Sequence, residues 1–365
     1  MAPPISQLRA AAYRVPTDAV EADGTLAWHA TTLVLVEVDA GGRTGLGYTY
    51  ADAALVELIA GHLRQVVEGA DAFEPTRIGE RLWHAVRNLG RSGMAACAIS
   101  AIDCALWDLK ARLLDLPLAR LLGSLRERVP VYGSGGFTSY TDARLAEQLG
   151  HWVHEDGCRW VKLKIGADCE RDLQRLAVAR EAIGDAGLFV DANGAHSSRS
   201  AIAFAARAAE LGIAWFEEPV SSDDLRGLRR VRAALDAAGH SLDIAAGEYA
   251  YTLDDMRRLL ETDALDVLQL DITRCGGVTG FLQASALCQA FHLDCSAHCA
   301  PALHLHTACA TPRLRHLEWF HDHVRIESRL FDGAPLLRDG HLTCDLDRAG
   351  HGLCLKAADA RHYAI

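Results

Sequence analysis

Two lysines alternate with apolar residues in the short run RWVKLKIG. Val161, Leu163 and Ile165 would lie on one side of a strand, and Lys162 and Lys164 on the other. On a half-buried strand the second side would simply face water. Two neighbouring ammonium groups also disfavour each other's charge, so the neutral form of Lys164 would become accessible near neutral pH as a base.

Carboxylates end the next three apolar runs. LFVDANG contains Asp191, IAWFEEP contains Glu217 and Glu218, and LDIAAGE ends at Glu248. Hard oxygen ligands on three adjacent strands favour Mg²⁺ over softer metals. Glu218 is a rival to Glu217, because alternation along a strand places only one of the pair at a metal.

The charged residues that end the sixth and seventh apolar runs predict acid/base chemistry. LDVLQLD ends at Asp271 and LDCSAH ends at His298. A carboxylate bonded to one ring nitrogen fixes the tautomer and leaves the other nitrogen to exchange protons. Asn193 in the DANG turn and Glu318 in HLEWF are candidates to hydrogen-bond a substrate carboxylate or its enolate. Glu318 must be protonated to donate, which apolar and acidic surroundings would favour.

Eight apolar runs, beginning with VPVYGSG, could position these groups. Their ends lie 20 to 31 residues apart, with Ala/Arg/Leu-rich helical segments between them. A strand, a helix and two loops use about this much chain, and eight such units close a parallel barrel, whose active site is at the C-terminal ends of the strands. Burying so many charged side chains at the strand ends would cost free energy unless the side chains are paired or bind a metal.

The chain before the barrel predicts a small α+β domain ending near Arg128. TTLVLVEV at residues 31–38 has the composition of a strand, and Gly41 and Gly42 form a turn after it. Between residues 95 and 114, apolar residues recur at steps of three and four, which is typical of an amphipathic helix, and Pro117 lies just past its end.

Read in order, the motifs KLK, VDANG, WFEEP, AGE, QLDITRCGG, SAH and HLEWF resemble the mandelate racemase subgroup of the enolase superfamily. AISAIDCALWDLKARLLDLPLARLLG resembles the capping-domain signature of that family, and DGHLTCDLDRAGHGLCLK its C-terminal return to that domain. The resemblance implies an α/β fold: a modified TIM barrel, (β/α)7β, at residues 129–325. It also implies an α+β capping domain built from residues 1–128 and the return at 326–365.

The resemblance also implies an enzyme that removes the proton next to a carboxylate. Lys164 would be the base on one face of the substrate, and His298 with Asp271 the opposite acid/base. Lys162 would contact the substrate carboxylate. The metal ligands implied for Mg²⁺ are Asp191, Glu217 and Glu248, the first glutamate being preferred over Glu218.

The choice of reaction rests on the last two strands. Asp271 stands where relatives resembling muconate cycloisomerase or dipeptide epimerase carry lysine, so a Lys-Lys epimerase is disfavoured. LHLHTA followed by LEWF resembles acid-sugar dehydratases such as those of galactarate and talarate. We therefore expect dehydration of an acid sugar, an aldonate or aldarate, to a 2-keto-3-deoxy acid through an enediolate. The alternative is a racemase or epimerase of a 2-hydroxy acid that uses the same bases. His196 and the histidine-rich stretch after His298 depart from the common pattern and leave the substrate open.

Two interpretations based on other metal sites compete with the acid-sugar dehydratase. His304 with His306, and His321 with His323, spell His-x-His, which supplies metal ligands in barrel hydrolases, but such a pair belongs at the first strand. Cys295, His298 and Cys299 could also suggest zinc, although no second cysteine pair is spaced to complete a tetrahedral site.

Composition limits the partners and the cellular location that we expect for this protein. The 365 residues carry 37 basic and 48 acidic side chains, a formal net charge of −11, so nucleic acid is an unfavourable partner. No run reaches the ~20 apolar residues of a membrane span, and MAPPISQLRAAAYRV lacks the layout of a secretion signal. We expect a cytoplasmic enzyme acting on a small-molecule carboxylate, with no membrane partner. Eleven irregularly spaced cysteines indicate reduced core thiols, and the resemblance implies a homo-oligomer, a dimer or an octamer.

Overall fold

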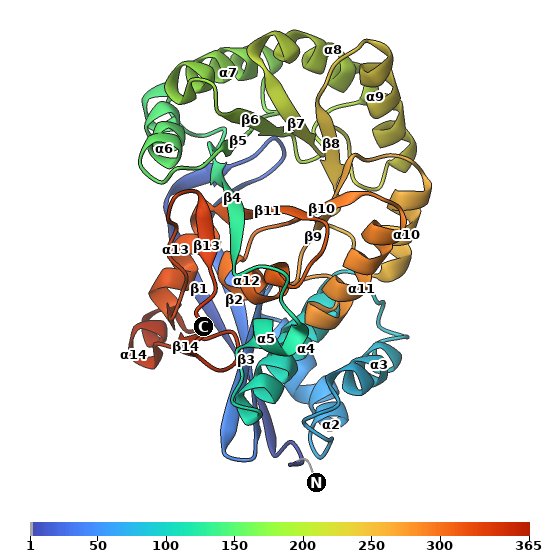
Figure 1. Ribbon diagram of the computed structural model, residues 1–365, viewed down its shortest axis with the longest axis vertical. Coiled ribbons are helices and arrows are strands. Elements are labelled where there is room, and N and C mark those ends of the chain that lie inside the picture. Colours follow the sequence, from blue (N-terminus) through green and yellow to red (C-terminus); the bar gives the residue numbers. More distant parts are fainter. Residues whose placement is uncertain (1–2) are drawn as a thin grey trace.

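The computed structural model describes residues 3–365 and divides into a capping part and a barrel (Figure 1). The chain opens with an antiparallel sheet in the order β1-β2-β3. The predicted turn at Gly41 and Gly42 joins its last two strands, with positive φ angles of 56° and 74° that glycine adopts without a steric cost. The strands are β1 (Gln7–Ala22), β2 (Ala27–Ala40) and β3 (Arg43–Tyr50).

Helix α4 (Met94–Leu113) packs across this sheet and confirms the helix expected at 95–114. Glycines make the close approach possible, because a Cβ atom at Gly45 would lie 2.2 Å from the carbonyl oxygen of Ala105. The shorter helical elements of this part are α1 (Leu55–Glu57), η1 (Leu58–Leu63), α2 (Arg64–Val67), α3 (Pro75–Ala85) and α5 (Leu118–Leu122).

All eight expected runs form parallel strands, and β11 pairs with β4 to close the barrel. The strands are β4 (Arg128–Gly135), β5 (Trp160–Lys164), β6 (Gly187–Asp191), β7 (Ile213–Glu217), β8 (Asp243–Ala246), β9 (Val267–Leu270), β10 (Asp294–Ala297) and β11 (Leu314–Phe320). The intervening helices are α6 (Asp142–His154), α7 (Cys169–Ile183), α8 (Ser198–Ala208) with η2 (Ala209–Leu211), α9 (Leu225–Ala237), α10 (Leu253–Glu261), α11 (Gly277–Ala290) and α12 (Pro301–Cys309). The expected modified (β/α)7β barrel is confirmed.

After the barrel the chain returns to the first sheet. Helix α13 (His321–Leu330) contributes Glu327, which accepts a 2.6 Å hydrogen bond from Tyr48 Oη of β3, and Tyr13 of β1 bridges Ala364. Both ends of the chain therefore build the capping part. The remaining elements are β12 (Phe331–Asp332), β13 (His341–Thr343), β14 (Cys354–Leu355), α14 (Ala357–Ala360) and η3 (Arg361–Tyr363).

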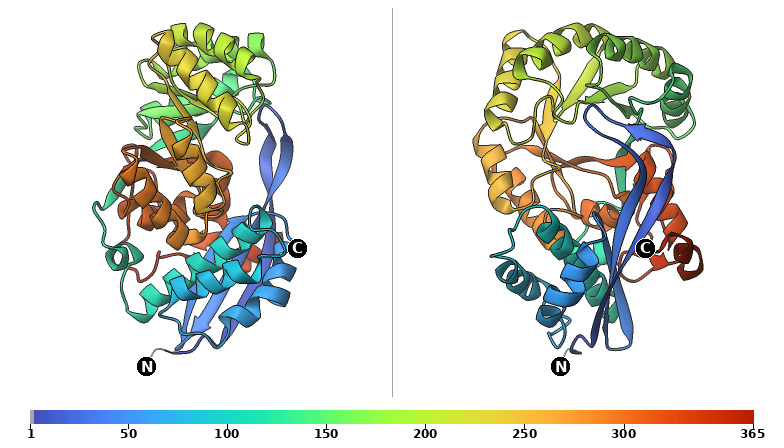
Figure 2. Two further views of the ribbon diagram at one scale, coloured as in Figure 1. Left: turned by 90° about the vertical axis from the view of Figure 1, so that its right-hand side faces the viewer. Right: turned by 180° about the vertical axis from the view of Figure 1, so that it is seen from behind.

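The far end of the β1-β2 hairpin extends to the barrel mouth (Figure 2). Thr138, just after β4, donates its N–H to the Ala22 carbonyl and its Oγ1–H to the Asp23 carbonyl, both at 2.8 Å. At the hairpin tip, a Cβ atom on Gly24 would lie 2.6 Å from the Ile165 carbonyl oxygen. The hairpin is thus seated on the strand ends that carry the charged residues. Among the helices of residues 3–365, none is long and apolar enough to cross a membrane.

Candidate active site

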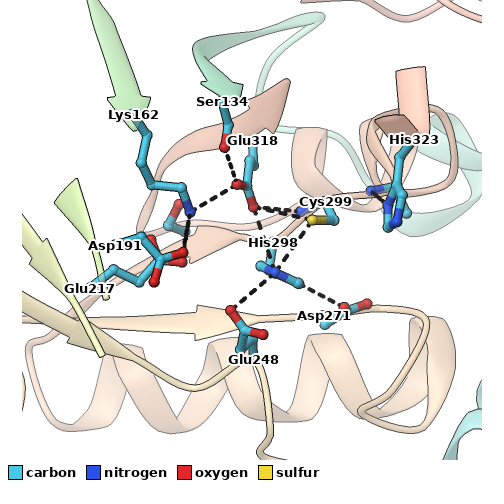
Figure 3. Close-up of polar contacts among 12 residues, drawn as sticks. Ser134, Lys162, Asp191, Glu217, Glu248, Asp271, His298, Cys299, Glu318 and His323 are labelled. Carbon is cyan, nitrogen blue, oxygen red and sulfur yellow. Dashed lines mark hydrogen bonds and ion pairs between the residues drawn. The ribbon is translucent and has the colours of Figure 1, made fainter. Parts of the chain in front are cut away.

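The barrel brings the predicted site residues to one end, and Figure 3 shows Lys162, Asp191, Glu217, Glu248, Asp271, His298 and Glu318 among them. Lys164, Asp191 and Glu217 are the last residues of β5, β6 and β7, because each strand stops where its apolar run stops. Below them, Phe189 and Trp215 stack with ring centroids 5.1 Å apart and fill the barrel interior. The site residues are all at most 6% exposed except Asn193: Lys162, Lys164, Asp191, Glu217, Glu248, Asp271, His298 and Glu318.

Three carboxylates form a compact oxygen cluster. One oxygen from each of Asp191, Glu217 and Glu248 lies within 4.8 Å of the others. Burial and the charge of Asp191 raise the pKa of Glu217 to about 8. Hard oxygen donors in this number fit Mg²⁺. The rival Glu218 has a φ of 38° and lines a hollow beside the cluster.

Lys162 and Lys164 point to the same side of β5, as the alternation predicts. Lys164 Nζ lies 2.5 Å from Asp191 Oδ2, and Lys162 Nζ lies 2.6 Å from Glu217 Oε1. Burial alone would lower the pKa of Lys164, but Asp191 raises it above its usual value. The expectation that the Lys162 ammonium makes neutral Lys164 accessible is therefore wrong in this structure, because the attraction of Asp191 exceeds the repulsion between the lysines.

His298 and Asp271 form the expected pair. His298 Nδ1 lies 2.8 Å from Asp271 Oδ2, and Asp271 Oδ1 accepts 2.7 Å hydrogen bonds from the Thr273 N–H and hydroxyl. His298 Nε2 is directed into the site, 3.3 Å from Glu248 Oε2. Burial alone would lower the pKa of His298, but Cys299 and the carboxylates of Glu248, Glu318 and Asp271 hold it well above its usual value. The imidazole is therefore held as a proton donor.

Glu318 is an acceptor rather than a donor. Its Oε1 accepts from Ser134 Oγ at 2.6 Å and lies 2.8 Å from Lys162 Nζ, and its Oε2 accepts from the Cys299 N–H at 3.0 Å. Burial alone would raise the pKa of Glu318, but Lys162 lowers it below its usual value. The expectation of a protonated Glu318 is wrong, because sequence spacing did not reveal that Lys162 contacts it.

Asn193 lies at the edge of the site with a φ of 46°. Its N–H donates to Asp191 Oδ1 across 2.9 Å, and its side-chain oxygen is buried without a hydrogen-bond partner. With Glu218 and Tyr249 it lines a hollow of about 500 Å³. Its amide is thus available to a ligand beside the carboxylate cluster.

Two further residues contact the site: Arg274, which sequence reasoning missed, and Cys299, which it considered only as a possible zinc ligand. Arg274 donates to the Glu248 carbonyl at 3.0 Å, and its Nε lies 3.4 Å from Asp271 Oδ2. Its position three residues after Asp271, in the same turn, could have indicated that Arg274 lies at the site. Cys299 has a φ of 53°, and its Sγ lies 3.3 Å from His298 Nε2. Its place directly after His298 was visible in the sequence.

Three histidines of the His-x-His pairs accept backbone hydrogen bonds, and the fourth, His321, lies 3.2 Å from Asp18 Oδ2. His304 Nε2 accepts from the Ile272 N–H at 2.9 Å, and His306 Nδ1 accepts from the Ala119 N–H at 3.1 Å. His323 Nδ1 likewise accepts from the Ala300 N–H at 3.2 Å. The eleven cysteines are unpaired by disulfides, as expected, and nine of them are buried.

Two family models match the chain. Residues 15–123 match the mandelate racemase/muconate lactonizing enzyme N-terminal domain, and residues 144–360 match the enolase C-terminal domain-like model. With its closed barrel and capping sheet, the chain is a member of the enolase superfamily. Within that superfamily it belongs to the mandelate racemase/muconate lactonizing enzyme family.

Characterised relatives in this family are lyases and isomerases. The chain is 34% identical to the L-talarate/galactarate dehydratase of Salmonella typhimurium, over 82% of this chain and 76% of that protein. It is 33% identical to the 3,6-anhydro-alpha-L-galactonate cycloisomerase of Streptomyces coelicolor, over 96% of this chain and 97% of that one. The chain is thus an enzyme of a family in which dehydration of acid sugars occurs.

Solved structures agree over the full length. A mandelate racemase/muconate lactonizing enzyme-like protein from Rubrobacter xylanophilus superposes with a TM-score of 0.96 at 49% identity, covering 100% of both chains. A racemase from Streptomyces coelicolor, solved with bound magnesium, gives a TM-score of 0.91 at 32% identity, covering 99% of this chain and 100% of that one.

Proposed function

We propose that the protein is a Mg²⁺-dependent dehydratase that converts an acid sugar, an aldonate or aldarate, to a 2-keto-3-deoxy acid. One observation carries this proposal: His298 Nε2 lies 3.3 Å from Glu248 and Lys164 Nζ lies 2.5 Å from Asp191, so both groups face the same carboxylate cluster. An acid and a potential base beside one carboxylate cluster are what loss of a proton and a hydroxyl from adjacent carbons requires.

The carboxylate cluster prepares the site for this chemistry. We assign Asp191, Glu217 and Glu248 as the Mg²⁺ ligands, since they offer three buried hard oxygens within 4.8 Å. Bound Mg²⁺ supplies Lewis-acid compensation for the negative charge on the substrate carboxylate. Solved relatives with bound magnesium support this choice of ion. Lys162 and the amide of Asn193 are assigned to hold the substrate carboxylate.

Lys164 is the proposed base and His298 the proposed acid. Asp191 lies 2.5 Å from the Lys164 ammonium and raises its pKa, and a divalent ion held by that carboxylate would weaken the attraction that keeps the lysine proton in place. Neutral Lys164 then takes the proton from the carbon next to the carboxylate, giving an enediolate. His298 donates its Nε2 proton to the hydroxyl that leaves the neighbouring carbon, and the enol product becomes the keto acid.

The same two groups could instead return a proton to the opposite face of the enediolate. That alternative, a racemase or epimerase of a 2-hydroxy acid, is favoured by the presence of one acid/base group at the end of β5, Lys164, and another just after β10, His298. Dehydration is preferred because the charge of His298 suits expulsion of hydroxide, and because characterised relatives include dehydratases of talarate/galactarate, arabinonate and gluconate.

Incubation with Mg²⁺ and a panel of aldonates, aldarates and mandelate-like acids tests the proposal. Semicarbazide traps 2-keto acids, so we expect a trapped product from one or more acid sugars. Stereochemical inversion without any trapped product would assign the racemase or epimerase instead. A chain that binds Mg²⁺ but changes no member of the panel would contradict both reactions for these substrate classes.

A further inference from the structure

A second set of potential metal ligands lies beside the carboxylate cluster. His298 Nε2 lies 3.3 Å from Cys299 Sγ, Cys299 Sγ lies 3.4 Å from Glu318 Oε2, and Nε2 lies 3.8 Å from that oxygen. A point about 2 Å from all three atoms therefore exists, which matches zinc–nitrogen and zinc–oxygen bond lengths and is close to the ~2.3 Å of a zinc–sulfur bond. All three residues are at most 5% exposed.

Neighbouring groups orient the three ligand atoms towards one another. Asp271 occupies His298 Nδ1 at 2.8 Å, which is the carboxylate–histidine arrangement found behind zinc ligands. Ser134 and Lys162 occupy the other oxygen, Oε1, of Glu318. The left-handed backbone of Cys299 and the bond from its N–H to Glu318 Oε2 turn the thiol back towards His298.

We propose that His298, Cys299 and Glu318 form an inhibitory site for zinc or another thiophilic divalent ion, next to the magnesium cluster but with a different set of ligands. The donor set makes the distinction, because a thiolate and an imidazole favour zinc whereas three carboxylates favour magnesium. The spacing in the sequence suggested Cys295 as a ligand together with His298 and Cys299, and it did not suggest Glu318. In the structure Glu318 of β11 supplies the third ligand.

Binding at this site removes two protons and disables the acid. The ion replaces the thiol proton of Cys299 and any proton on His298 Nε2, and both protons pass to solvent. With three protein ligands, the fourth tetrahedral position stays open to water or to a substrate oxygen, as in zinc sites that exchange ligands. While the ion is bound, His298 has no Nε2 proton to donate.

Cobalt(II) titration of the full-length protein in excess Mg²⁺ tests binding without any assay of activity. Cobalt(II) bound by a thiolate gives an intense near-ultraviolet charge-transfer band, which cobalt(II) held by carboxylates alone lacks. We expect the band in the wild type and in Cys354→Ser, which removes the exposed thiol. We expect it to vanish in Cys299→Ser and to weaken in His298→Asn. Absence of the band in the wild type, or an unchanged band in Cys299→Ser, overturns the proposal.

Inhibition is the second readout, and it rests on the proposed function because it needs a turnover assay. Zinc added in excess Mg²⁺ should inhibit the wild type, while Cys299→Ser should need at least ~10-fold more zinc for the same fractional inhibition, since one of three ligands is lost. Equal zinc sensitivity of the two proteins overturns the inhibitory role. A protein with the cobalt band but no turnover on acid sugars contradicts the dehydratase and leaves the metal site supported.

Discussion

The imidazole of His298 donates its Nδ1–H to the carboxylate of Asp271 across 2.8 Å, although the two residues are 27 positions apart in the chain. The neighbouring strands β9 and β10 end just before them, so the barrel register alone places them side by side. This contact fixes the ring orientation and leaves Nε2 facing the carboxylate cluster.

Asp271→Asn should impair catalysis and change its pH dependence. The hydrogen bond to Asp271 contributes to the raised pKa of His298, so its loss lowers that pKa, and the protonated acid is lost at a lower pH. We expect kcat to fall by ~10²–10⁴-fold and the alkaline limb of the kcat/KM profile to move to lower pH. A profile of unchanged shape would argue against His298 as the acid.

The fold could be predicted from the sequence because each strand of a parallel barrel corresponds to a short, local apolar run. Each strand is a short apolar run, and the charged residue at its end, such as Asp191 or Glu217, marks where it enters the mouth. The carboxylate cluster follows once the barrel closes, because adjacent strand ends are neighbours.

The sequence could not predict which charged side chains pair with one another at the barrel mouth. Lys162 contacts Glu217 and Glu318 as well as lying near Lys164. Its charge lowers the pKa of Glu318, against the expected protonated form, while Asp191 rather than Lys162 dominates the pKa of Lys164. These protonation states depend on distances of a few ångströms across the barrel, which neither periodicity nor spacing encodes. The position of the capping hairpin could not be predicted either, because its close approach to Ile165 is a tertiary contact made by Gly24.

Glu217→Gln should weaken Mg²⁺ binding. The pKa of Glu217 is raised to about 8 by burial and by Asp191, and an amide cannot supply the anionic oxygen that a cation stabilises. We expect a loss of affinity beyond the ~10–100-fold typical of an outer-shell partner. Calorimetric titration measures it, with the exposed Glu210→Gln as the matched control. Equal affinity in the two variants would exclude Glu217 as a ligand.

Gly24→Ala should displace the capping hairpin. The added Cβ would lie 2.6 Å from the Ile165 carbonyl and 2.9 Å from the Ala192 carbonyl, so the hairpin must shift away from the strand ends. Misplacement of about 1 Å near a reacting centre can cost ~10²-fold, and we expect a kcat/KM loss of that order with Mg²⁺ affinity retained. Gly61→Ala is the control, because its Cβ would meet nothing within 4 Å; similar losses in both variants would count against the hairpin.

Glu327→Gln should flatten the pH dependence of stability. Burial raises the pKa of Glu327 from 4.5 to about 8, so the folded protein binds an extra proton between these values and its stability falls as pH rises through that window. The amide removes this slope, at a cost of ~1–3 kcal/mol for one lost bond to Tyr48 or Ala302. Urea unfolding between about pH 5 and 8 measures both effects, and an unchanged slope would contradict the assignment.

The most direct test of the central claim follows deuterium from D₂O into the acid sugar that gives a trapped keto acid. Proton NMR of the wild type should show a 2-keto-3-deoxy acid with deuterium on the carbon next to the new carbonyl. His298→Asn should exchange the proton next to the carboxylate while forming little keto acid, since Lys164 still removes that proton. Lys164→Ala should do neither. Exchange retained in Lys164→Ala but lost in His298→Asn would contradict the assigned roles of base and acid.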